Sequence, residues 1–310
     1  SPSSDHGVTT VVIGNCGVGF APCRAEDRER LVELMEGVED IPGVVMAEGL
    51  SWDWESYPEF LDRIEDRAHD INIASYLPHA ALRVFVMGER ASAGQAATPT
   101  DLKRMAELTA EAMRAGAIGF SSSRSLFHKS SSGEAIPTLE ADASELGAIA
   151  DAMRDAGSGI LQIATDYKNF TDIDNEFALI RDVACRARRE MTLPIAQTHA
   201  DPEGWRKILS LIADANDDGI CVTAQVLPRG IGLLLGHDLS MHPFSFCPSY
   251  MEIHELPLIE RIERMRDPAL KARIIAEAPI EPTLPLQQQV RRFGGMFEIT
   301  EPLDYEPPLD

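Results

Sequence analysis

Residues 8–23 read VTTVVIGNCGVGFAPC, a short apolar run followed by a glycine-rich turn. The β-branched run at 8–13 predicts a strand that is buried on both faces. The strand breaks at Gly14, and Cys16 places one thiol at the tip of the turn. In α/β proteins the carboxyl ends of strands are where active sites are built. Cys16 is therefore a candidate metal ligand or nucleophile, with inert packing as the third interpretation.

Strand-like and helix-like segments alternate along the chain as far as residue 226. The expected strands are 8–13, 71–76, 116–122, 159–165, 193–198 and 220–226. The expected helices are 26–36, 57–66, 99–115, 138–156, 174–190 and 203–215. This order predicts right-handed crossovers and a parallel sheet. Because no GxGxxG fingerprint or P-loop occurs, we predict an α/β chain that forms an incomplete (β/α)8 TIM-type barrel of about six βα units.

The last part of the chain differs from these repeats. It holds a Gly/Leu loop, an aromatic and Pro-rich stretch, and charged helices expected at 256–266 and 268–277. We interpret residues 1–230 as the central part of the barrel and residues 231–310 as a long C-terminal insertion or cap. The chain begins without Met almost directly at a strand and stops in a Pro-rich acidic stretch. Both ends indicate an internal fragment of a longer protein.

Composition narrows the classes of partner. The formal net charge of −22 argues against unaided binding to nucleic acid or to an anionic membrane, because phosphate contacts need clusters of Lys and Arg. No apolar run reaches the roughly 18 residues of a transmembrane helix, and no signal peptide opens the chain. Five scattered cysteines fit a reducing compartment. We expect a cytoplasmic protein that binds a small molecule.

Other polar residues follow the predicted strands. His199 comes at the end of strand 193–198, and a neutral imidazole suits zinc. His79 and Asp166 each lie just past another strand and are further candidates for a metal or for the site. A bound carboxylate would need a cation nearby. The cations near predicted strand ends or in the adjoining loop are Arg124, Lys129 and Arg229.

Three segments resemble one family. GVTTVVIGNCGVGFAPC is similar to the Gly-Val-Thr-Thr…Gly-Asn-Cys-Gly…Ala-Pro segment of the N-acyl-D-amino-acid deacylases (D-aminoacylases) of the amidohydrolase superfamily. LPHAALR, residues 77–83, resembles that family's Gly-His-Ser-x-Leu-Arg, with Pro78 where Gly is usual. GAIGFSSS, residues 116–123, resembles its Gly-Ala-x-Gly-Phe-Ser strand. The segments come in the family's order, and the resemblance covers most of residues 1–230.

The resemblance implies a metal-dependent amidohydrolase on a (β/α)8 barrel. In such an enzyme a water activated by zinc attacks an amide carbonyl, here most simply that of an N-acyl-D-amino acid. The family's zinc is held by the Cys of Asn-Cys-Gly and by one His on each of two consecutive later strands. Cys16 matches the first ligand and His199 matches the second of the two histidines.

The chain departs from the family pattern in three places. The strand GILQIATDY offers Gln162, Thr165 and Asp166 where the first of the two histidines is expected. The family's His-x-His precedes the segment where this chain begins, and its catalytic Asp, the general base, is expected beyond residue 310. Three explanations stay open. Histidines upstream of this chain complete the metal site, Asp166 takes the place of the missing histidine, or this branch of the family has lost or changed its metal.

Two other functions stay open on the sequence. A barrel that has lost its metal site would be a non-catalytic ligand-binding protein. Alternatively, Cys16 is the nucleophile of an amidase and His199 its base, because a thiolate nucleophile needs a nearby base.

Overall fold

The computed structural model describes residues 2–167, 171–198, 201–227, 232–239, 241–280, 290–300 and 302. Its centre is a parallel sheet of six strands whose order in space is their order along the chain. The strands are β1 (Thr10–Ile13), β2 (Asn72–Pro78), β3 (Gly119–Arg124), β4 (Ile160–Thr165), β5 (Met191–Pro194) and β6 (Val222–Gln225). The sheet curves into a half-barrel, which confirms the predicted α/β class and the incomplete TIM-type barrel.

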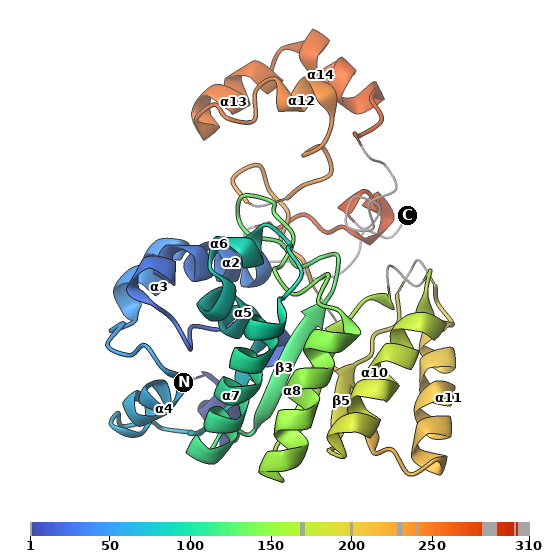
Figure 1. The fold of residues 1–310 in the computed structure, drawn as a ribbon. Helices are drawn as coiled ribbons and strands as arrows, with labels where there is room; N and C mark the ends of the chain where they lie inside the picture. Colours follow the sequence, from blue (N-terminus) through green and yellow to red (C-terminus); the bar gives the residue numbers. More distant parts are fainter. Residues whose placement is uncertain are drawn as a thin grey trace. The chain divides into compact units, whose positions relative to one another are not determined.

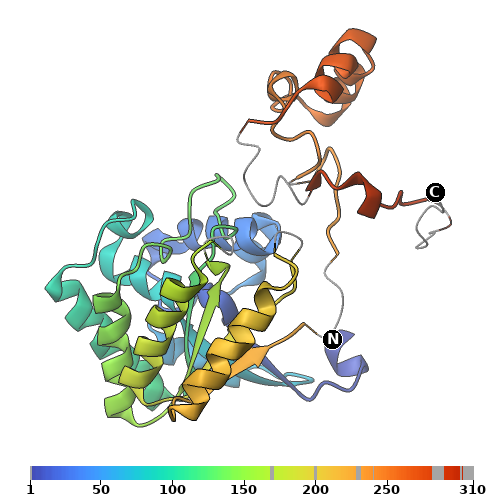
Figure 2. The same ribbon diagram turned by 90° about the vertical axis from the view of Figure 1, so that its right-hand side faces the viewer.

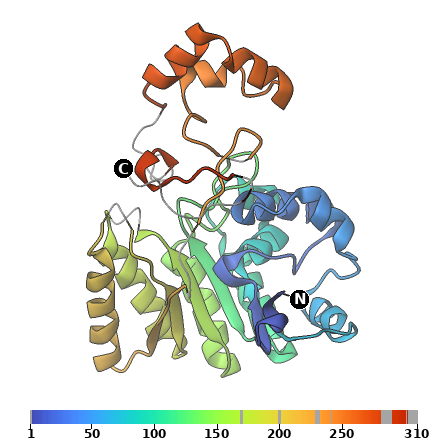
Figure 3. The same cartoon turned by 180° about the vertical axis from the view of Figure 1, so that it is seen from behind.

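Helices on one face of the sheet make the wall of the half-barrel (Figures 1 and 2). Those that follow β2 to β5 are α5 (His79–Met87), α6 (Glu89–Ser92), α7 (Pro99–Ala115), α8 (Ala143–Ala156), α10 (Ile173–Ala187) and α11 (Gly204–Asp217). Seen from behind, the strands lie in front of these helices (Figure 3). The long connection from β1 to β2 contains α2 (Arg28–Glu39), α3 (Gly43–Gly49) and α4 (Tyr57–Glu65).

Helix α7 begins where its sequence predicts. The Thr98 hydroxyl accepts a hydrogen bond from the backbone N–H of Asp101, and the Asp101 carboxylate accepts one in return from the backbone N–H of Thr98. Such a capping box satisfies two donors that the first turn of a helix leaves unpaired. Pro99 occupies the first helical position, where its missing N–H costs nothing.

The core of the half-barrel lies between the sheet and the helices. Leu77, Phe120 and Leu161 are buried side chains of β2, β3 and β4, and they belong to the same cluster as Ile149 of α8 and Ile180 of α10. Because side chains alternate along a strand, the intervening residues face the opposite side, the interior of the barrel. On β3 and β4 that inner face carries Ser121 and Gln162, which are paired in register.

Several predicted boundaries are wrong. The strand expected at 193–198 lies at Met191–Pro194, and the strand expected at 116–122 runs from Gly119 to Arg124. The helix expected at 138–156 begins only at Ala143, because the Asp142 side chain caps it. No helix is expected from the sequence between residues 76 and 99, but α5 lies there with eight of its nine residues buried, polar His79 and Arg83 included.

The chain divides into two compact units, residues 1–228 and 229–310. The second unit contains α12 (Pro248–Met251), α13 (Leu258–Met265) and α14 (Pro268–Ala276). These helices surround their own small core, made by Cys247, Tyr250, Ile253, Leu270 and Ile274. The interpretation of residues 231–310 as an insertion or cap stays a prediction. Within the described ranges, the helices are all too short or too polar to cross a bilayer.

Residues 14–17, here called the Cys16 turn, lie directly against the sheet. Gly17 has a φ of +74°, and a Cβ atom at this position would lie 2.7 Å from the Cα of Ser122. Only glycine fits such a conformation and such a close approach of two backbones. Gly17 therefore lets the turn that follows β1 pack onto β3.

Replacing Gly17 by Ala is expected to lower the free energy of unfolding by more than about 2 kcal/mol, since it adds backbone strain and a clash with Ser122. Gly133 is the matched control, with a φ of +87° and no atom within 4 Å of its would-be Cβ. Gly133→Ala should cost only about 1 kcal/mol, from strain alone. Urea unfolding of the two variants measures the difference, and equal losses would show that the close packing contributes nothing.

Candidate functional site

The Cys16 turn lies over the carboxyl end of β1 and is tied to the inner face of two later strands. The backbone N–H of Gly17 donates to the Ser121 hydroxyl at 3.2 Å, and that hydroxyl donates to the carbonyl of Gly14. The backbone N–H of Cys16 donates to Oε1 of Gln162 at 2.8 Å. Three hydrogen bonds thus hold a four-residue turn against β3 and β4, at the barrel face where strand-end sites are built.

Cys16 is half-buried and has a φ of 57°, a left-handed conformation that is uncommon for a residue with a Cβ. Burial, with a smaller contribution from the negative charge of Glu39, raises the pKa of its thiol to about 11. The thiol is therefore protonated near neutral pH. A divalent cation bound to the sulfur would reverse this, because a coordinating thiol loses its proton.

Gln162 lies on β4, the strand on which the family resemblance places a histidine. Its side chain is fully buried, with 0% exposure, and its Nε2 finds no hydrogen-bond partner in the described part of the chain. An unsatisfied buried donor of this kind costs about 1–3 kcal/mol. The sequence signal was available, since a Gln inside an otherwise apolar strand needs partners.

A second polar cluster lies at the carboxyl ends of β3 and β4. Asp166 is buried, and its Oδ2 accepts from the backbone N–H of Leu126 at 2.6 Å and from the Ser125 hydroxyl at 3.2 Å. His128 shares a 2.7 Å hydrogen bond with the Ser123 hydroxyl through Nδ1. Burial lowers the pKa of His128, and the negative charge of Asp166 opposes this only in part. His128 is therefore neutral near pH 7.

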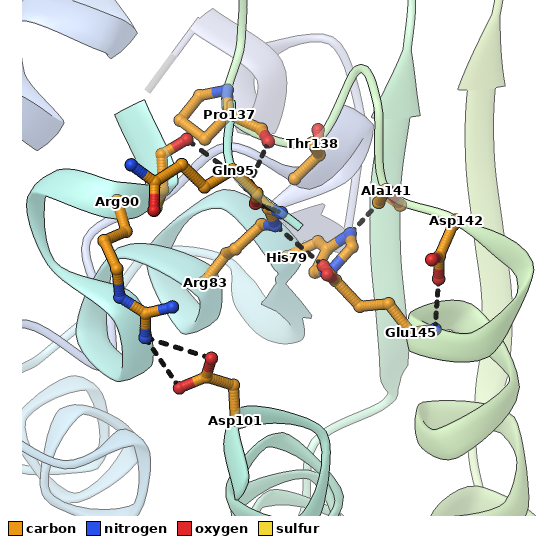
Figure 4. A network of polar contacts seen from close by, with 12 residues as sticks. His79, Arg83, Arg90, Gln95, Asp101, Pro137, Thr138, Ala141, Asp142 and Glu145 are labelled. Carbon is orange, nitrogen blue, oxygen red and sulfur yellow. Dashed lines mark hydrogen bonds and ion pairs between the residues drawn. The ribbon is translucent and has the colours of Figure 1, made fainter. Parts of the chain in front are cut away.

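His79 lies on the other face of the sheet, within the helical wall (Figure 4). It is fully buried, and its Nδ1 lies 2.8 Å from the Ser122 hydroxyl while its Nε2 lies 2.8 Å from Oε1 of Glu145. Arg83 shares that carboxylate oxygen at 2.9 Å. Both ring nitrogens are occupied, so His79 has none left for a metal. We assign it to the packing of the wall rather than to the site.

The charges in this wall are compensated by each other. Burial on its own would raise the pKa of Glu145, but the hydrogen bonds from His79 and Arg83 and their electrostatic contributions outweigh it and hold the pKa below its ordinary value. Arg83 also donates to the carbonyls of Pro137 at 2.8 Å and Gln95 at 2.6 Å (Figure 4). The buried pair of Glu145 and Arg83 thereby ties α8 to α5, and the same arginine ties α5 to two loops.

The predicted cations lie in different surroundings. Arg124 makes a bidentate pair with Glu176, at 2.8 and 2.9 Å, and donates to the carbonyl of Ala141 at 2.7 Å. The structure thus engages its guanidinium with protein groups, where the sequence predicted a substrate carboxylate. Lys129 is exposed in the loop after β3. Arg229 and His199 lie outside the described residues, so their roles stay predictions.

The donor atoms of the candidate residues are of the kinds that zinc binds. A thiolate, an imidazole and a carboxylate are all ordinary zinc ligands, and zinc takes three or four of them from the protein. Cys16 and Asp166 both follow strands at the carboxyl edge of the half-barrel. Among the residues that the structure describes, no three His, Cys, Asp or Glu side chains come together around one point. Cys16, Asp166 and His199 fit the metal by the chemistry of their donor atoms.

Substitution of Glu145 tests the buried network. Glu145→Ala leaves His79 and Arg83 without their shared acceptor, and breaking a buried ion pair in this way costs about 3–5 kcal/mol. Because the pKa of Glu145 is lowered in the folded state, its stabilisation is present above the ordinary pKa of 4.5 and is lost as the pH falls through the lowered value. Urea unfolding between pH 7 and pH 3 should therefore show a shallower acid loss in Glu145→Gln than in the wild type.

Glu107 provides the control for that comparison. It pairs with Arg104 one turn away on α7, and its side chain is 50% exposed. Exposed pairs of this kind contribute about 0–1 kcal/mol, so Glu107→Gln should leave both the stability and its pH dependence almost unchanged. A loss in Glu145→Ala no larger than that in Glu107→Gln would contradict the assigned role of the network.

Known proteins share segments and the fold of this chain. D-aminoacylase of Alcaligenes xylosoxydans xylosoxydans is 33% identical over 121 residues, which is 39% of this chain and 22% of that protein. N-acyl-D-aspartate deacylase of the same organism is 29% identical over 120 residues, 39% of this chain and 21% of the relative. The matched segments thus span about a fifth of the length of these curated relatives.

Solved structures agree on the architecture. A crystal structure of D-aminoacylase superposes with a TM-score of 0.56 at 20% identity, over 94% of this chain and 59% of that one. A second D-aminoacylase structure, described as having a binuclear metal centre, gives a TM-score of 0.57 at 20% identity over 90% and 54% of the two chains. At this identity the superposition establishes the fold. The sequence itself matches the Amidohydrolase family over residues 1–279, and the chain therefore belongs to the amidohydrolase family.

Proposed function

We propose that this chain carries part of the active site of a metal-dependent hydrolase of linear amide C–N bonds. The observation that supports this most directly is the position of Cys16. In a chain of the amidohydrolase family, its thiol follows β1 at the carboxyl edge of a half-barrel and is held there by β3 and β4. The substrate we propose is an N-acyl-D-amino acid, since the relatives include a D-aminoacylase and an N-acyl-D-aspartate deacylase.

Zinc is the metal we propose, and Cys16, His199 and Asp166 are the residues that would hold it. When bound, such a metal supplies a Lewis acid that activates water for attack on the amide carbonyl. The Asp166 carboxylate is oriented by the backbone N–H of Leu126 and by the Ser125 hydroxyl. Second contacts of this kind fix the direction in which a carboxylate presents its remaining lone pairs.

The other residues of the inner face would handle substrate rather than metal. His128 is neutral near pH 7 and hydrogen-bonded to Ser123, so it can donate or accept one hydrogen bond near the carboxyl ends of β3 and β4. Lys129 is exposed on the same loop. We propose that Lys129 pairs with the substrate carboxylate, together with Arg229, which lies outside the described residues. Arg124 is less suited to this contact because Glu176 already pairs with it.

A cysteine-nucleophile amidase has less support. A nucleophilic thiol needs a lowered pKa, so that a useful fraction is thiolate at neutral pH. Burial instead raises the pKa of Cys16 to about 11. This environment suits a thiol that loses its proton when a cation binds and stays protonated otherwise.

The metal content of the protein tests the proposed zinc site. The wild-type protein should contain stoichiometric zinc by elemental analysis, and Cys16→Ser should lose most of it. Cys185→Ser is the matched control, because Cys185 is an exposed cysteine of α10. Since binding must displace the thiol proton, the affinity for zinc should rise as the pH rises from 6 to 8. Zinc retained by Cys16→Ser would exclude Cys16 as a ligand.

The substrate is tested separately with matched pairs of D and L substrates. The zinc-loaded full-length protein that contains this chain should hydrolyse N-acetyl-D-amino acids and leave their L enantiomers almost untouched, whereas the isolated 310-residue chain is expected to be inactive. Absence of turnover with both hands in a protein that binds zinc through Cys16 would overturn the substrate class while leaving the metal site standing.

A further inference from the structure

Gln162 occupies an unusual position on the inner face of β4. It is fully buried beneath the Cys16 turn, its Oε1 accepts from the backbone N–H of Cys16, and its Nε2 has no partner in the described part of the chain. The two bonded residues are 146 positions apart in the sequence. The bond therefore links the turn after the first strand of the half-barrel to the fourth strand.

The direction of the amide follows from Cys16. Turning the Gln162 amide over would set its NH2 group against the backbone N–H of Cys16, so that two donors would meet without an acceptor. With the oxygen directed to Cys16, the NH2 group is left unpaired. The Gln162 side chain thus gives the Cys16 N–H its hydrogen-bond acceptor, while its own NH2 group stays without one. Buried polar groups in folded proteins normally have partners, and the bond to Cys16 explains why this one does not.

The backbone of Cys16 needs a stabilising hydrogen bond from outside its own turn. Its φ of 57° is a left-handed conformation that a residue with a Cβ adopts at a cost, and such conformations persist where the surroundings hold them. Ser121 bonds to Gly14 and Gly17 on either side of Cys16. Gln162 is the partner of the Cys16 backbone itself.

We propose that Gln162 is a positioning residue for Cys16, which holds the left-handed backbone and thereby keeps the thiol in place at the carboxyl edge of β1. It acts through its side-chain oxygen, and the NH2 group is not required. The positioning concerns Cys16 in the metal-free protein. Its consequence for metal binding rests on the proposed function.

The proposal separates two substitutions of nearly equal volume. Gln162→Met removes the oxygen that Cys16 needs without opening a cavity. Gln162→Glu keeps an oxygen acceptor at the same place and replaces the NH2 group, which has no partner in the described part of the chain, by a second oxygen. The first variant should free the Cys16 turn, and the second should keep it in place.

The accessibility of the Cys16 thiol is measured by alkylating the metal-free protein with iodoacetamide. Mass spectrometry of the peptides then gives the alkylation rate of each cysteine. Loss of one hydrogen bond should raise the alkylation rate of Cys16 in Gln162→Met by about tenfold. Gln162→Glu should react at the wild-type rate or more slowly. The exposed Cys185 and Cys221 are internal standards whose rates should not change. An unchanged Cys16 rate in Gln162→Met, or equal acceleration in both variants, would overturn the proposal.

A measurement on the wild type covers the case in which Gln162→Met does not fold. The amide proton of Cys16 should exchange slowly with deuterium, because Gln162 accepts it, and rapid exchange at Cys16 in the folded wild type would refute the role.

Cobalt titration distinguishes this inference from the proposed function. A sulfur-to-Co²⁺ charge-transfer band should appear in the wild type and require a higher Co²⁺ concentration in Gln162→Met. Absence of the band in the wild type would reject Cys16 as a metal ligand, whereas the alkylation result would stand by itself. A band with the same Co²⁺ dependence in both proteins would show that Gln162 does not position the thiol for metal.

Discussion

The contact between the Cys16 turn and the inner face of β3 and β4 is the constraint on which the candidate site depends. A turn four residues long has no core of its own, so its conformation must come from the sheet beneath it. Gly17 allows the close approach, Ser121 bonds both flanks of the turn, and Gln162 bonds its centre. The thiol is thereby fixed by strands that lie more than a hundred residues further along the chain.

The two faces of the sheet have different chemistry for a physical reason. The outer face is covered by helices and is mostly apolar, and the polar groups buried there, Ser122 of β3, His79 and Arg83 of α5 and Glu145 of α8, are hydrogen-bonded to one another. A buried charge without a partner would cost several kcal/mol, which explains why Arg83 and His79 both contact the Glu145 carboxylate. The inner face carries Ser121, Ser123 and Gln162 instead. These polar side chains distinguish the inner face from a barrel interior filled by branched apolar residues.

Buried ion pairs also decide which cations are available to a ligand. Arg124 is the last residue of β3, at the carboxyl edge of the half-barrel, and from the sequence it is as suitable for a substrate carboxylate as Lys129. The structure separates them, because Glu176 forms two hydrogen bonds with the Arg124 guanidinium while Lys129 extends from an exposed loop. A bidentate pair of this kind fixes α10 against β3 and would have to break before Arg124 could bind a carboxylate.

The order of strands and helices and the parallel half-barrel were determined by local patterns in the sequence. β-Branched runs, the Thr98–Pro99 cap and the glycine-rich turn at Cys16 act over a few residues and could be recognised without any tertiary contact. Helix α5 lacks the polar face by which a surface helix is recognised, because eight of its nine residues are buried. Tertiary structure alone decided that His79 belongs to the wall and that Gln162 supports Cys16. Both roles depend on partners 43 to 146 residues away, and no spacing rule encodes which face of a strand meets them.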